Sequence, residues 1–127
     1  MPSKQLFIIR TALMAGVGAF AAIVTFQRSQ GMNAGFAAPE VLGNLRYVLW
    51  ALAAFSVAAA LFLRGRVDAA ADRQKGMMLI VGWAFGEGVA LLGTVQHFMG
   101  APLSTMAVGM VAFIAVLMIL PIPRARS

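Results

Sequence analysis

Cysteine is absent from the 127-residue sequence, which excludes disulfide bonds, iron–sulfur clusters and thiol chemistry. Charged residues are also scarce: they make up 11% of the chain, against roughly 25% in water-soluble domains. Acidic residues are scarcer than basic ones: the chain has four Asp and Glu and ten Lys and Arg. It also has one histidine. A chain this poor in charge cannot cover a folded domain with polar surface, so we expect lipid to surround it.

The sequence also lacks the patterns that carry most known chemistry. No hydrolase, kinase, dinucleotide-binding or zinc motif is present. Acid–base catalysis usually needs two positioned groups, and the candidates Glu87 and His97 lie about 15 Å apart along a helix. We therefore expect no enzyme activity and no cofactor. The net charge of +6 would favour nucleic acid in a soluble protein, but no basic face with interleaved aromatic residues exists, so no nucleic-acid partner is expected.

What the sequence does contain is apolar length, with 61% hydrophobic residues and a mean hydropathy of +0.88. Four apolar runs stand out: Leu6–Phe26, Leu45–Leu63, Met77–Phe98 and Leu103–Leu120. Each has about 18 to 22 residues, enough for a helix to cross a hydrocarbon core of about 30 Å. Backbone polar groups in lipid must be satisfied within the segment. The sequence thus predicts one all-α domain over 1–127, an integral membrane four-helix bundle with up-down-up-down topology.

Proline and glycine mark the ends of the predicted helices. None of the five prolines falls inside a predicted span. Gly100 and Pro102 suit a helix that ends on a left-handed glycine and a next helix that starts near proline. Pro121 is expected to stop the last helix. We predict loops over Gln27–Asn44 and Arg64–Gly76, the two longest connections between the spans.

Basic residues are distributed unevenly between the two sides of the predicted bundle. The first side has Lys4, four Lys and Arg in the Arg64–Gly76 connection, and two arginines at the C-terminus. The second side has only Arg28 and Arg46. The positive-inside rule therefore predicts that both termini are cytoplasmic. The basic residues would also contact anionic lipid headgroups.

Small residues give the third predicted span a face for close helix packing. Gly82, Gly86, Ala90 and Gly93 follow one another at steps of four, four and three, and Gly16 offers a similar site in the first span. Helices associate in lipid by close approach, which small residues allow, although glycine is common in membrane helices anyway. The partner is either this chain, another copy or another subunit. The face favours a structural or accessory subunit of a homo- or hetero-oligomeric membrane complex.

Glu87 is the one carboxylate inside any predicted span. A charge at this depth costs roughly 2.5–3.5 kcal/mol on insertion scales, and burial favours the neutral acid. One interpretation is a proton- or sodium-binding subunit that uses Glu87, with Ser56 and Thr94 as auxiliary ligands. The other is a protonated carboxyl that hydrogen-bonds across a helix interface and holds an assembly together.

The segment Ala84-Phe85-Gly86-Glu87, with Gly93 beyond the acid, resembles the ion-binding helix of rotary ATP synthase proteolipid subunits. The resemblance covers about 25 residues and implies that Glu87 is the ion-binding carboxylate of a ring-forming subunit. The chain departs from that family in its alanine-rich second span and in its extra spans. Otherwise it resembles small bacterial four-helix membrane proteins, which implies the bacterial inner membrane as its location.

Two further polar residues border the predicted spans. His97 could ligate haem or a chlorophyll through a neutral imidazole, but a bis-histidine site needs a second histidine, so an interfacial hydrogen-bonding role is the better interpretation. Arg10 lies about one turn inside the first span and is expected to extend to the cytoplasmic headgroups. We do not expect Arg10 to reach Glu87, because about half the bilayer separates them along the helix axes.

Overall fold

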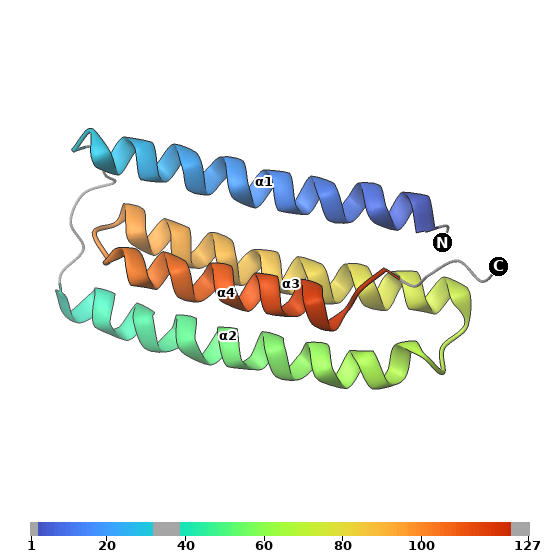
Figure 1. Cartoon of the computed structure of the whole chain (residues 1–127). Helices are drawn as coiled ribbons and strands as arrows, with labels where there is room; N and C mark the ends of the chain where they lie inside the picture. The colour runs from blue at the N-terminus through green and yellow to red at the C-terminus, as the bar shows by residue number, and fades with distance from the viewer. Residues whose placement is uncertain (1–2, 32–38, 123–127) are drawn as a thin grey trace.

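The computed structural model describes residues 3–31 and 39–122, and within these stretches it is all-helical. The four helices are α1 (Ser3–Ser29), α2 (Pro39–Val67), α3 (Asp72–Phe98) and α4 (Leu103–Ile119). They lie side by side, and helices that follow one another in the sequence run in opposite directions (Figure 1). The predicted all-α helical bundle is confirmed. By length and composition α1, α2 and α3 can each cross a membrane, whereas α4 is shorter, at 17 residues, the low end of the range for a span.

α1, α2 and α3 extend beyond the apolar runs that predicted them, whereas α4 ends one residue before its run does. α1 continues to Ser29 and α2 already begins at Pro39, so the predicted loop over Gln27–Asn44 was too long. The predicted loop over Arg64–Gly76 shrinks likewise, because α2 ends at Val67 and α3 begins at Asp72. An apolar run marks the hydrophobic part of a helix and not the end of its hydrogen-bonded backbone. Polar residues therefore continue α1, α2 and α3 past their apolar runs, and proline suits a first helical position.

The connection between α3 and α4 is tight and matches the glycine–proline prediction. Gly100 has a positive φ of 116°, and Pro102 caps the start of α4 with φ −65° and ψ 160°. α4 ends at Ile119, and Leu120 forms its C-cap directly before Pro121, as the rule on residues preceding proline favours. The short turn places α3 and α4 next to each other as antiparallel neighbours.

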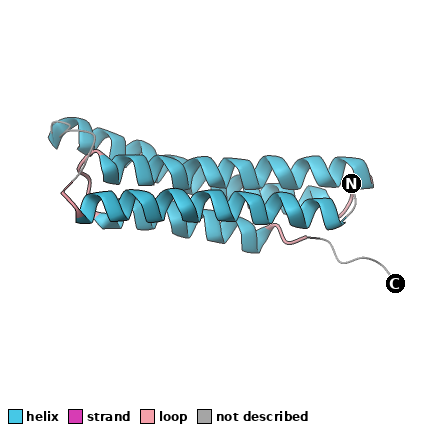
Figure 2. Ribbon diagram, turned by 90° about the horizontal axis from the view of Figure 1, so that it is seen from above, coloured by secondary structure: helices cyan, strands magenta, loops and turns pink. Residues whose placement is uncertain are grey.

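α3 is the central helix of the described chain. It packs against each of the other three helices. α2 also packs against α4, and the backbone of α1 lies close to that of α3. Figure 2 shows the helices extending lengthwise along one another. The largest fully buried side chains belong mainly to the interfaces of α3 with its neighbours; they include Trp83, Leu79, Leu49, Val116 and Leu120. The surroundings of a side chain on α3 therefore depend on whether it faces α1, α2 or α4.

Candidate functional site

The small-residue face of α3 packs against α4 of the same chain. A Cβ atom at Gly93 would lie 2.9 Å from the carbonyl oxygen of Thr105, and one at Gly109 would lie 2.8 Å from the carbonyl oxygen of Val89. These are backbone atoms, so no rotamer change would relieve the contact. The two helices approach each other as closely as glycine permits.

The other small residues singled out from the sequence fall into two groups. A Cβ at Gly86 would meet Val116 of α4 at 3.2 Å, a Cβ at Gly82 would collide with Leu120, and Ala90 is fully buried. Gly16 lies on an exposed face of α1 with open space around it. The α3 face is thus occupied within the monomer, and an oligomer would have to form through other surfaces.

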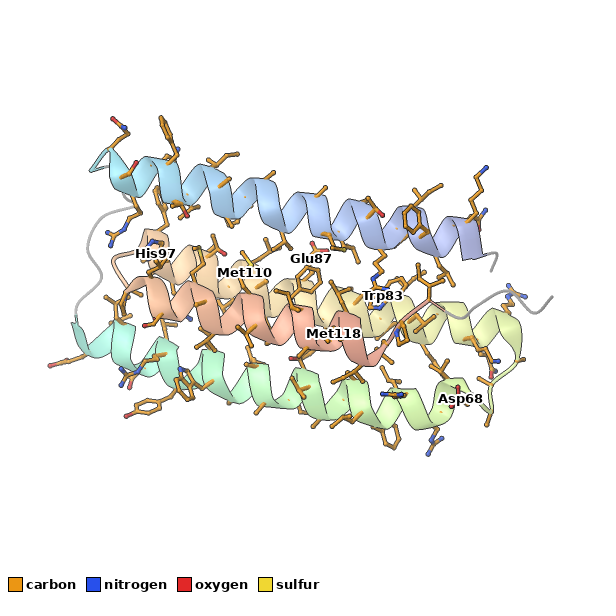
Figure 3. The ribbon with its side chains drawn as sticks, viewed as in Figure 1. Asp68, Trp83, Glu87, His97, Met110 and Met118 are labelled. Atoms are coloured by element: carbon orange, nitrogen blue, oxygen red, sulfur yellow. The ribbon has the colours of Figure 1, made fainter. Side chains whose placement is uncertain are left out.

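Glu87 lies between α1 and α3, near the middle of the bundle (Figure 3). Its Oε2 atom is buried and has no hydrogen-bond partner among the described residues. Trp83, Ala90 and Thr94 are fully buried and share its helical face. Because buried polar atoms are normally hydrogen-bonded, this unpartnered carboxyl oxygen makes Glu87 the candidate functional residue of α3.

Neither proposed auxiliary ligand contacts Glu87. The Ser56 hydroxyl donates to the carbonyl oxygen of Ala53 in its own helix, at 2.8 Å. α2 packs against the face of α3 that carries Val89, and at 100° per residue Glu87 points nearly the opposite way. The Thr94 hydroxyl donates to the carbonyl oxygen of Ala90 at 2.8 Å, and two helical turns, about 10 Å, separate it from Glu87. Neither of these two hydroxyls therefore donates a hydrogen bond to Glu87.

Arg10 points into the bundle, not toward the headgroups as the sequence suggested. Its Nη2 donates to the carbonyl oxygen of Leu117 at 2.9 Å, and its Cζ lies 5.7 Å from the centroid of the Trp83 ring. The reason lies in Pro121, which follows Leu117 by four residues and has no N–H to continue the helix. The Leu117 carbonyl thus needs another donor, and Arg10 supplies it.

Trp83 satisfies a second carbonyl at the same end of α4. Its indole Nε1 donates to the carbonyl oxygen of Leu120 at 2.8 Å, and the ring is fully buried. Arg10 and Trp83 together cap a helix C-terminus that ends inside the bundle, where a cation also complements the helix dipole. The sequence analysis did not identify this cluster. A signal was present, because Pro121 has no N–H to donate to the carbonyl of Leu117, four residues earlier.

His97 lies at the opposite end of α3 and is buried in a hydrogen bond. Its Nδ1 lies 2.8 Å from the carbonyl oxygen of Ala101, so this nitrogen is the donor. The neighbouring Gln96 is 1% exposed; its Nε2 donates to the carbonyl oxygen of Leu45 at 3.1 Å, while its Oε1 has no partner. These bonds join the α3–α4 turn to the start of the apolar part of α2. Within the described ranges, no three His, Asp or Glu side chains are grouped to hold a metal ion.

A groove follows the seam between α2 and α4, on residues other than those around Glu87. It has a volume of about 720 Å³ and opens along the bundle surface. Its lining is almost wholly apolar and rich in alanine; it includes Ala54, Ala58, Ala107, Ala112 and Ala115. The small side chains along this seam leave room for close approach of another helix.

The chain matches no known family, no curated protein and no solved structure. Its function must therefore be argued from its own residues.

Proposed function

We propose that this protein is an integral membrane protein that binds and exchanges a proton, or a small cation, at Glu87. The observation that carries the proposal is the buried Oε2 atom of Glu87, which has no hydrogen-bond partner in the described structure. A carboxyl among apolar side chains in the middle of the bundle lowers stability, and ionisable residues at such positions usually serve a function. The local resemblance of Ala84–Gly93 to the ion-binding helix of proteolipid subunits agrees with this function.

The proposal is supported by what surrounds the carboxyl. Its own helical face is filled by the fully buried Trp83, Ala90 and Thr94, and the Thr94 hydroxyl is already bonded to the Ala90 carbonyl. The flanking Gly88 has nothing within 4 Å of a would-be Cβ, which leaves space beside the carboxyl. A protonated carboxyl is neutral and fits this environment, while a deprotonated one needs a cation.

Replacement of Glu87 with glutamine tests the proposal. Glutamine keeps the size and the hydrogen-bonding capacity but cannot exchange a proton. In proteoliposomes under a potassium diffusion potential, we expect Glu87→Gln to lower proton flux at least tenfold, with particle size in detergent unchanged. The matched control is Glu40→Gln, the same substitution at an exposed residue, which should keep the wild-type flux.

Labelling provides a second readout on the same proteins. An apolar carbodiimide reacts with a protonated carboxyl in lipid, so Glu87 should be modified at acid pH and protected at alkaline pH. Equal flux in Glu87→Gln and wild type would contradict the proposal. So would wild-type labelling that stays constant across pH.

A second candidate is an accessory subunit that binds a transmembrane helix of another membrane subunit. The α2–α4 groove favours it, because small residues let helices approach closely in lipid. In this case Glu87→Gln would leave proton flux unchanged. A bulky substitution in the groove, Ala58→Leu, would instead alter the association state in mild detergent, which separates the two candidates.

We further propose that the bundle crosses the bacterial inner membrane with both termini in the cytoplasm, as the distribution of Lys and Arg favours. The absence of cysteine permits a direct test with single-cysteine variants. Ser29 ends α1 and Ala69 lies between α2 and α3, and both are exposed. An impermeant maleimide should label Ser29→Cys on intact cells. It should label Ala69→Cys only after permeabilisation, and the reverse pattern would overturn the orientation.

A further inference from the structure

Arg10 and Glu87 lie on the same seam between α1 and α3. The Arg10 guanidinium sits over the ring of Trp83, with 5.7 Å between Cζ and the ring centroid. Trp83 precedes Glu87 by four residues, so the two side chains are neighbours on one helical face, about 5–6 Å apart at their Cβ atoms. The contact of Arg10 with Trp83 therefore lies on the same face of α3 as the unpartnered carboxyl of Glu87, which Figure 3 shows between α1 and α3.

From α1, the charged side chain of Arg10 contacts the face of α3 that carries Glu87, through the Trp83 ring. α4 contains no charged residue, and the remaining charges of α1 and α2 lie near the helix ends. These are Lys4 and Arg28 on α1, and Glu40, Arg46, Arg64 and Arg66 on α2. On α3 itself the other titratable groups, Asp72, Arg73, Lys75 and His97, also lie toward the two ends.

We infer that Arg10 is the internal counter-cation of Glu87 and that it restricts the site to protons, excluding sodium and other metal cations. This inference rests on the proposed function. When Glu87 is protonated, Arg10 keeps its bond to Leu117 and its place over Trp83. When the proton leaves to the medium, the carboxylate accepts hydrogen bonds from guanidinium N–H groups that the bond from Nη2 to Leu117 leaves free.

Electrostatics explains the selectivity. A carboxylate and a guanidinium in a low-dielectric interior attract each other strongly, and such a buried pair leaves no net charge to be neutralised. A sodium ion would have to displace the guanidinium and place two cations side by side. The proton meets no such obstacle, because it neutralises the carboxylate while Arg10 keeps its contacts with the Leu117 carbonyl and the Trp83 ring.

The test is whether sodium protects Glu87 against carbodiimide in variants of Arg10. At fixed pH in proteoliposomes, sodium should slow labelling of the wild type less than twofold. In Arg10→Gln it should slow labelling at least fivefold, because sodium then occupies the vacated position. Arg10→Lys keeps the positive charge and should behave as the wild type. Arg28→Gln, the same exchange near the far end of α1, is the matched control and should show no protection.

Each result decides for or against the inference. Sodium protection in the wild type equal to that in Arg10→Gln would overturn it, and so would the absence of protection in Arg10→Gln. If Arg10→Gln does not fold, Arg10→Met carries the same fivefold expectation, because its apolar chain keeps the packing against Trp83. Wild-type labelling that does not depend on pH would instead remove the proposed function, so the two failures are distinguishable.

Discussion

Alanine at Gly109 is expected to lower the free energy of unfolding by about 2–3 kcal/mol, near the upper end of what overpacking usually costs. The new Cβ would lie 2.8 Å from the carbonyl oxygen of Val89 and 3.1 Å from the Cα of Ala90. Both atoms belong to the α3 backbone, so the helices must separate along their whole contact to relieve the clash. Loss of helical signal on heating in detergent measures the change. Gly93→Ala should act similarly, and the double variant should cost less than the sum, because the two glycines touch.

Gly16→Ala and Gly88→Ala are the matched controls for this prediction. A Cβ at either position meets nothing within 4 Å. Because alanine is favoured over glycine in a helix by up to about 1 kcal/mol, these variants should be as stable as the wild type or slightly more so. Equal stability of Gly109→Ala and Gly88→Ala would mean that α3 and α4 do not approach as closely as described.

Replacement of Trp83 with alanine is expected to cost about 3 kcal/mol, the low end of the range for large-to-small changes in soluble cores. The low end applies to a bundle in lipid, as proposed above, because lipid, unlike water, does not penalise exposed apolar surface. The substitution leaves a cavity at a fully buried position and removes the donor to the Leu120 carbonyl. It also removes the ring under Arg10, so unfolding in detergent and sodium protection of Glu87 should both change.

Two variants separate the contributions to this effect. Trp83→Phe keeps an aromatic ring but loses the N–H donor and part of the ring volume, so it should cost about 1–2 kcal/mol, less than Trp83→Ala. Trp50 is 59% exposed, and Trp50→Ala should leave stability within about 0.5 kcal/mol of the wild type. If Trp83→Ala were no more harmful than Trp50→Ala, the cap on the end of α4 would not be a stabilising element.

The sequence predicted the four helices and the glycine–proline turn between α3 and α4. The ends of α1 and α2 were less predictable. Gly100 and Pro102 carry local conformational preferences, and the structure follows them. The ends of α1 and α2 lay beyond the apolar runs, because polar residues such as Ser29 and Arg64 continue a helix once its apolar part is formed. The candidate acid Glu87 was also apparent from sequence, since a carboxyl in an apolar run is conspicuous wherever it lies.

What the sequence by itself determined is the all-α class and the position of Glu87 along a helix, because length, hydropathy and backbone hydrogen bonding are local along the chain. Only the tertiary structure decided which neighbours those residues meet. The glycine face of α3 meets α4, Ser56 lies away from Glu87, and Arg10 bonds to Leu117 across 107 positions of sequence. These contacts depend on how each helix is rotated about its axis and shifted along its neighbours. The rotation and shift of each helix are determined by close packing and by hydrogen bonds to backbone carbonyls at helix ends. Neither can be derived from the order of residues in the sequence.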